Sequence, residues 1–559
     1  MASGTAVRVL LALLCAGLGG AGLWRASRIN PDGSSPSAKY LRTICVAGCV
    51  WYSAAWLVIA AIRFKYPYEL EWIGGELHDH CMRVLNSQPL YVPPSSSWFP
   101  YEYQPVYFWV CAILMKLTHN ETYEPMRMVS IVSTILSAAI LFAWTRSLIL
   151  RSLFVRDRTV AAGIVWPALA VGILFAGYRF SSAWFDTEHL DMLFTLFLLA
   201  GGYLLQCAED ARTSSSAPGK KQKIWQLTPF EFTLLAGIVF ELAFFTKQQG
   251  AIFILACGAA LAWRRSKANL AAFAAVTCGM SATGIYVLNH ATHGWYGYYC
   301  FRVPFSNGIK LNLAANFFLA DMPLYAPAIA VIGLAILYRM RAATREGSSG
   351  TASTDEGHIF SSDAVFAAML IAALAAGLLS RAHWGGAENV LIAAYILLGE
   401  GAAVAAGRWE IRNRGAAKWL YMLCAAQLVV LAYRPDLQVP HRSNFAAGAA
   451  YHALIDSLQR EGEVLCIDHG GFTTPAHFQI MALMDVIGAE KRLPQPVQAG
   501  LDVHRYAAIV TDAPPEKSGP LSALAKAYPN VTRIGITDTW VVTGFPTPSK
   551  LRPVYVMRR

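Results

Sequence analysis

Long apolar segments are the feature that most constrains the fold of this chain. They lie at residues 8–24, 41–62, 126–147, 159–179, 188–206, 229–246, 249–263, 269–289, 317–338, 361–380, 388–407 and 419–434. An α-helix of about 20 apolar residues crosses the roughly 30 Å hydrocarbon layer of a bilayer. Charged residues make up 14% of the chain, against roughly 25% in an average soluble protein. We therefore predict an all-α polytopic membrane protein with about 11–12 transmembrane helices.

Short basic loops between the apolar segments predict the topology. The basic residues of six loops are Arg25, Arg28 and Lys39; Arg146, Arg151, Arg156 and Arg158; Lys220, Lys221 and Lys223; Arg264, Arg265 and Lys267; Arg339, Arg341 and Arg345; and Arg408, Arg412, Arg414 and Lys418. Basic loops of membrane proteins stay in the cytoplasm. This rule explains the net charge of +11 more simply than nucleic-acid binding does, and no nucleic-acid partner is expected.

The other loops then face the opposite side of the membrane. They comprise 63–125, 180–187, the turn Thr246–Gly250, 290–316, 381–387 and the chain after 435. Only one helix can cross between an external loop and the next internal loop, and segment 126–147 does so. The shorter apolar segment 104–118 is therefore expected to form an interfacial or re-entrant helix. Segment 8–24 is read either as a true span or as an uncleaved anchor.

The composition becomes more polar after about residue 435 and predicts a small α/β domain. Residues 463–468 and 507–511 have the pattern of buried strands, and 474–488 and 519–527 that of helices. Two or three further strands are expected between Thr532 and Met557. The segment His469–Phe472 follows the first strand, either as a ligand loop or, as Gly-Gly favours, as an ordinary turn.

We thus divide the chain into three parts. Residues 1–40 form an N-terminal membrane anchor and a cytoplasmic loop. Residues 41–435 form the transmembrane domain, whose external loop 63–125 carries interfacial helices. Residues 440–559 form the external α/β domain.

Glu69 and Glu71 are the first candidate catalytic residues, because they follow the 41–62 segment by only a few residues. A carboxylate that is partly buried among aromatic rings has a raised pKa and can act as a general base. The same oxygens are the candidate ligands of a divalent cation, Mg²⁺ or Mn²⁺. Alternatively, these two acids form the solvent-exposed face of a juxtamembrane helix together with Glu76 and Asp79.

Asp186, Glu188 and Asp191 form a second acidic cluster at the start of segment 188–206. Acidic residues at membrane depth are costly and therefore indicate function. Capping of the helix N-terminus is the alternative explanation.

Two cations on the external side run against the positive-inside trend. Lys247 and Arg381 suit an anionic headgroup or a phosphate leaving group, whereas snorkelling is the alternative for Lys247. The candidate substrate-pocket residues are Tyr103, Gln248, His383, Glu388 and Asn389. Four external loops thus carry polar groups at one depth, which predicts a site at the lipid–water boundary.

The stretch "YELEWIGGELHDHCMRVLNSQPLYVPP" and the following "FPYEYQPVYFWVCAILMKL" resemble the first external loop of GT-C superfamily glycosyltransferases of the family 39-like type. The segments "FDTEHLDMLFTLFLLAG", "FFTKQQGAIFILACG" and "HWGGAENVLIAAYILLG" are similar to later parts of that superfamily. The resemblance covers about residues 40–410 in order, and the tail "TGFPTPSKLRPVYVMRR" looks like the soluble end domain of bacterial members.

The resemblance implies an enzyme of the bacterial inner membrane with a periplasmic active site. It implies an inverting transfer of a hexosyl or pentosyl group from a polyprenyl-phosphate donor to a glycan, lipid or protein acceptor. Glu69 or Glu71 takes the place of the base, and the cluster Asp186, Glu188 and Asp191 that of the second acidic motif. Lys247 matches the position beside the donor phosphate.

Two other classes of function compete with the transferase. A secondary transporter of an anionic or lipid-linked solute usually has inverted repeats and charges at the membrane midplane, and neither pattern is visible in the sequence. A non-catalytic scaffold for the C-terminal domain gives no reason for four polar loops to converge.

Overall fold

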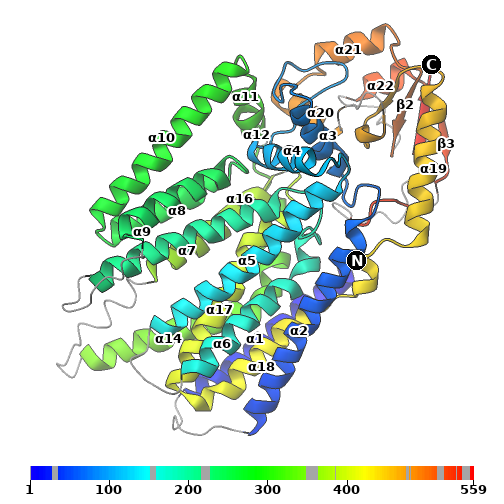
Figure 1. The fold of residues 1–559 in the computed structure, drawn as a ribbon. Helices are drawn as coiled ribbons and strands as arrows, with labels where there is room; N and C mark the ends of the chain where they lie inside the picture. Colours follow the sequence, from blue (N-terminus) through cyan, green and yellow to red (C-terminus); the bar gives the residue numbers. More distant parts are fainter. Residues whose placement is uncertain are drawn as a thin grey trace.

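The computed structural model describes residues 2–27, 36–151, 159–215, 227–306, 308–347, 363–383, 385–473, 478, 480–512, 521–536, 538–543 and 554–559. Within these ranges, a bundle of long helices is covered at one end by short helices and by a small α/β domain (Figure 1). The basic residues predicted at 28, 156, 158, 220, 221 and 223 lie outside the described residues.

Each predicted apolar segment forms a helix of the bundle, which confirms the fold class. The helices are α1 (Ala2–Ala26), α2 (Pro36–Phe64), α5 (Glu124–Arg151), α6 (Thr159–Ala176), α7 (Asp191–Ser215), α8 (Pro229–Phe244), α9 (Gly250–Trp263), α10 (Lys267–Ala291), α14 (Ala326–Gly347), α16 (Ala364–Arg381), α17 (Ile392–Arg412) and α18 (Ala417–Val430). Among the described residues, eight stretches are long and apolar enough to cross a membrane. The helices α6, α8, α9 and α18 do not reach that length and hydropathy by themselves.

Short elements cover one end of the bundle. They are α3 (Gly74–Leu85), α4 (Val106–Thr118), η1 (Tyr178–Ser181), α11 (Trp295–Gly297), η2 (Tyr298–Arg302), α12 (Val303–Ser306), α13 (Leu311–Asn316), η3 (Phe317–Asp321), η4 (Met322–Tyr325), η5 (Glu388–Leu391) and η7 (Pro435–Gln438). The turn η6 (Arg414–Ala416) joins α17 to α18 at the opposite end. α4, the segment predicted not to cross, lies across the end of the bundle (Figure 1).

The α/β domain is built on a four-stranded mixed sheet. Its elements are α19 (Arg442–Gln459), β1 (Val464–Cys466), η8 (Gly470–Phe472), α20 (Ile480–Glu490), α21 (Gln495–Asp502), β2 (Ala508–Thr511), α22 (Ser522–Ala527), β3 (Asn530–Ile534) and β4 (Val554–Arg558). The strand order is β1-β2-β4-β3, in which β1 and β2 are parallel and the other pairs are antiparallel.

Alternation along β1 and β2 sends side chains to two different cores. Val464 and Val510 pack with α19 and Trp540. Leu465 and Ile509 point the other way and share one apolar cluster with loop 63–125 and α3, as the two-residue period of a strand requires. The domain is therefore packed directly onto the first external loop.

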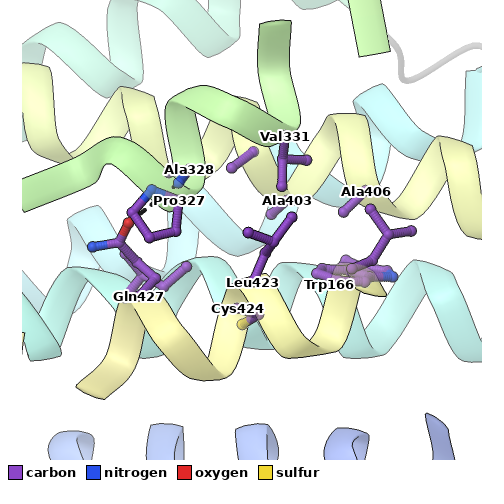
Figure 2. Close-up of a pocket in the computed structure, with 12 residues that line it drawn as sticks. Trp166, Pro327, Ala328, Val331, Ala403, Ala406, Leu423, Cys424 and Gln427 are labelled. Atoms are coloured by element: carbon purple, nitrogen blue, oxygen red, sulfur yellow. Dashed lines mark hydrogen bonds between the residues drawn. The ribbon is translucent and has the colours of Figure 1, made fainter. Parts of the chain in front are cut away.

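Inside the bundle, an apolar pocket lies between α6, α14, α17 and α18 (Figure 2). Its wall includes the ring of Trp166 and several alanines of α17, and none of the described residues that line it is charged. The amide of Gln427 is bound by the backbone, donating to Leu324 O at 2.9 Å and accepting from Ala328 N–H at 3.3 Å. This pocket offers no group for acid–base or phosphate chemistry.

Candidate active site

Both acids of the first loop lie beside the N-terminus of α3. Glu71 accepts a hydrogen bond from the backbone N–H of Ile73 at 2.9 Å, and Glu69 accepts one from Gly75 at 3.0 Å. Unpaired backbone N–H groups and the helix dipole favour carboxylates at this position. Each side chain is only 1% exposed, and the two acids of α3 are buried as well. The alternative prediction, that these four acids form the solvent-exposed face of a helix, is therefore wrong.

Two glycines make room for these carboxylates. A Cβ atom at Gly74 would lie 2.5 Å from Glu188 Oε1, and one at Gly75 would lie 2.7 Å from Glu69 Oε2. Real Cβ atoms do not approach other atoms so closely. The Gly-Gly sequence is therefore required by the close approach of acidic side chains to the start of α3.

Replacing Gly75 by alanine is expected to lower the free energy of unfolding by about 1–3 kcal/mol, because the added methyl group overpacks a filled site. Equilibrium unfolding of the full chain in detergent measures the loss. Gly258→Ala is the control, since a Cβ there meets nothing within 4 Å and alanine favours a helix. Equal stability of the two variants would contradict the packing argument.

Glu69 and Glu71 differ in the partners of the carboxylate oxygen that does not bind the start of α3. Glu69 Oε1 accepts a hydrogen bond from Trp540 Nε1 at 3.2 Å and contacts His469 Nδ1. Glu71 Oε1 is buried and has no hydrogen-bond partner among the described residues. Burial raises the pKa of Glu71 well above its usual range, and neighbouring carboxylates add to this effect against one backbone hydrogen bond. Glu71 is thus the acid with a free proton-accepting oxygen.

Two members of the second acidic cluster bind buried arginines. Asp186 Oδ1 lies 3.1 Å from Arg63 Nη1, and Glu188 Oε2 lies 2.8 Å from Arg127 Nε. All four side chains are fully buried. Arg127 also donates to four backbone carbonyls between Arg63 and Tyr68. These ion pairs fix the loop that carries the two first-loop acids.

Sequence reasoning missed both arginines. Each belongs to a helix of the bundle, Arg63 to α2 and Arg127 to α5. An arginine within or at the end of an apolar segment is costly and marks a buried partner. That signal was available from the sequence alone.

Asp191 connects three other segments at the start of α7. Its Oδ1 lies 2.7 Å from Lys247 Nζ, and its Oδ2 accepts from Asn389 Nδ2 at 2.8 Å and lies 2.7 Å from His189 Nδ1. Lys247 is 6% exposed and comes from the turn between α8 and α9. Helix capping and snorkelling are therefore incomplete explanations, because the carboxylate and the ammonium bind each other inside the protein.

The ring of Tyr103 joins the two parts of the site. Lys247 Nζ lies 6.0 Å from its centre, and the His189 ring meets it edge-on at 5.8 Å. Burial raises the pKa of the Tyr103 hydroxyl well above its usual range, and Asp191 and Glu71 are among the carboxylates that raise it further. Acids from the first loop and from α7 therefore both act electrostatically on the Tyr103 hydroxyl.

The remaining predicted residues have other partners. Arg381 binds both oxygens of Asp321, at 2.7 and 3.1 Å. Glu388 accepts from a serine hydroxyl at 2.9 Å, and Gln248 donates to a backbone carbonyl of η2 at 2.9 Å. His383 is half-buried, and its Nδ1 has no hydrogen-bond partner within the described ranges. Of the two predicted cations, the one that joins the acidic cluster is thus Lys247.

The surroundings of Glu69 show whether this carboxylate could bind a divalent cation. Within the residues that the structure describes, no group of three or more His, Cys, Asp or Glu side chains is arranged to hold a metal ion. The oxygens of Glu69 face the donors of Gly75, Trp540 and His469. This set of donors suits a carboxylate and does not fit a divalent cation.

The α/β domain also contributes to the site, which sequence reasoning did not predict. His469, which lies 400 positions from Glu69 in the chain, follows β1 and reaches the carboxylate together with Trp540. No local pattern around the His-Gly-Gly sequence indicates this contact, because it depends on how the domain packs onto loop 63–125.

No family model and no curated protein matches the sequence. Among solved structures, ArnT from Cupriavidus metallidurans in the apo state is similar, with a TM-score of 0.53 and 13% identity over 91% of this chain and 97% of that one. ArnT bound to undecaprenyl phosphate gives a TM-score of 0.43 at 14% identity over the same shares. The oligosaccharyltransferase from Archaeoglobus fulgidus gives 0.44 at 12% identity, over 83% and 69%. At this level of identity, the match to apo ArnT shows a shared fold.

Proposed function

We propose that this protein is a membrane glycosyltransferase that uses a polyprenyl-phosphate sugar as donor. The observation that carries the proposal is the buried Lys247–Asp191 pair beside the Tyr103 ring, together with the free Glu71 oxygen of the first loop. This arrangement supplies a proton acceptor and a cation at one end of a bundle with the fold of ArnT. The acceptor is a glycan, lipid or protein of the cell envelope.

The reaction is a single displacement with inversion. The acceptor hydroxyl oxygen attacks the anomeric carbon of the sugar while the bond from that carbon to the phosphate oxygen breaks. The hydroxyl proton moves to Glu71, and the electron pair of the broken bond leaves with the polyprenyl phosphate. A positioned general base contributes about 10²–10⁴-fold to such a step.

Lys247 compensates the charge that develops on the leaving phosphate. An ammonium group has three hydrogen-bond donors. One of them is engaged by Asp191, which leaves donors for phosphate oxygens. Because Asp191 holds the Lys247 side chain in place and the protein shields it from water, the ammonium group needs little reorganisation during the reaction.

The basic loops support a cytoplasmic position for the opposite end of the bundle. The site and the α/β domain then face the periplasm of a bacterial cell. A lipid-linked donor reaches such a site from the bilayer, because its polyprenyl chain stays in the hydrocarbon layer.

Lys247→Met is the direct test of the proposal. We expect kcat for transfer from a labelled polyprenyl-phosphate sugar, measured with the full chain in nanodiscs, to fall about 10²–10³-fold. Lys65→Met is the matched control, since Lys65 is 72% exposed and pairs with Glu124 at the surface. Failure of the unmodified chain to release polyprenyl phosphate from any donor would refute the function. Full activity of Lys247→Met would refute the role of the lysine.

A further inference from the structure

The α/β domain presents a histidine held between two carboxylates. His469 Nδ1 contacts Glu69 of the first loop, and His469 Nε2 lies 2.9 Å from Asp512 Oδ2. His469 follows β1, and Asp512 directly follows β2. Because β1 and β2 are parallel neighbours, their carboxyl ends share one edge of the sheet. The topology of the sheet therefore brings the histidine and its second carboxylate together.

Aromatic rings and glycines surround the contact of His469 with Glu69. The imidazole is 2% exposed and meets the Trp540 ring edge-on at 4.5 Å. Trp540 in turn stacks on Tyr451 of α19 at 4.3 Å. On the same edge, a Cβ at Gly471 would lie 3.4 Å from the Gly75 Cα, so the two glycine pairs let the domain approach the start of α3.

Both ring nitrogens of His469 face carboxylate oxygens, which favours an imidazolium that donates from both. Burial opposes the charged form, but Glu69 and Asp512 outweigh it and raise the pKa of His469 to about 10. Asp468 lies beside the same pair, and its carboxylate accepts from Thr511 Oγ1 at 2.6 Å. Glu69 is thus provided with a fixed cationic partner from a different domain.

Fixing Glu69 also fixes the loop that carries Glu71. The other oxygen of Glu69 accepts from the Gly75 backbone N–H at 3.0 Å, and Glu71 binds Ile73 N–H between these points. His469 is therefore the end of a chain of contacts that defines the position of Glu71. The Glu71 oxygen that remains free is the one that the proposed reaction uses.

We propose that His469 is a positioning residue of the active site, through which the α/β domain holds Glu69 and thereby orients Glu71 toward the acceptor. The inference rests on the proposed glycosyl transfer. It assigns the domain a part in the reaction itself, in addition to any role in recognising the acceptor.

Three substitutions of His469 separate a positioning role from simple domain docking. His469→Asn keeps an N–H group near the Nδ1 position, which faces Glu69, whereas His469→Gln keeps one near the Nε2 position, which faces Asp512. We expect His469→Gln and His469→Ala to lower kcat about 100-fold, as a misplaced catalytic group does, with the donor KM unchanged. His469→Asn should recover most of kcat. The reverse order would overturn the proposal, as would wild-type kcat in His469→Ala.

A second measurement does not depend on activity. Hydrogen–deuterium exchange of the full chain should be faster over residues 69–77 in His469→Ala and His469→Gln than in His469→Asn. Tyr506→Phe is the control for docking, since Tyr506 binds the Ser96 carbonyl of the first loop away from the acids, and it should keep kcat. Unchanged exchange in His469→Ala refutes the positioning role whatever the transfer assay gives. An inactive wild type with the expected exchange pattern refutes the proposed function alone.

Discussion

Replacing Glu71 by glutamine should abolish most of the transfer, with kcat lowered about 10²–10⁴-fold and donor binding retained. The amide has nearly the shape of the carboxylate and can still accept from Ile73 N–H, but it cannot take up the acceptor proton. Glu69→Gln should cost less, about 10–100-fold, because it disturbs the position of the base rather than removing it. Initial rates with saturating donor in nanodiscs distinguish the two variants. A larger loss in Glu69→Gln would reassign the base.

The pH dependence of the wild type tests the same assignment. Burial raises the pKa of Glu71, and a general base works only when it is deprotonated. Transfer should therefore be lost as the pH falls through this raised pKa, well above the usual range of a glutamate. The acid limb should disappear from the residual activity of Glu71→Gln. An acid limb that persists in this variant would contradict Glu71 as the titrating base.

The largest effect on stability is expected at Arg127. Arg127→Met leaves Glu188 as an unpaired buried carboxylate and removes the donors for four carbonyls of the first loop. Breaking a buried ion pair by removing one partner costs about 3–5 kcal/mol. Equilibrium unfolding in detergent measures the change in free energy.

The control for this prediction is Lys65→Met. It breaks an ion pair to Glu124 in which the lysine is 72% exposed, and exposed pairs contribute at most about 1 kcal/mol. Equal losses in Arg127→Met and Lys65→Met would show that the buried pair does not hold the loop.

The sequence was sufficient to predict the fold class and the half of the candidate site that contains Lys247 and Asp191. Each apolar segment became a helix because its length and composition leave few alternatives in a bilayer. Lys247 and Asp191 could be identified because ionisable groups at membrane depth need a partner, and here they are each other's partner.

The rest of the site depends on contacts that no local pattern encodes. Glu69 and Glu71 are equivalent in sequence, and only the packing of Trp540 and His469 leaves one oxygen free on Glu71 and none on Glu69. The Gly-Gly after His469 indicates a turn, and η8 begins there. That reading describes the backbone and gives no information on where the imidazole points.

The strand order also determines when the sheet can close during folding. β4 follows β3 along the chain but inserts between β2 and β3, so the four-stranded sheet cannot close before Val554–Arg558 is available to pair. β1 and β2, whose carboxyl ends carry His469 and Asp512, pair directly with each other, but an isolated two-stranded sheet is only marginally stable in water. β4 is therefore the strand that completes the support of this histidine–carboxylate pair.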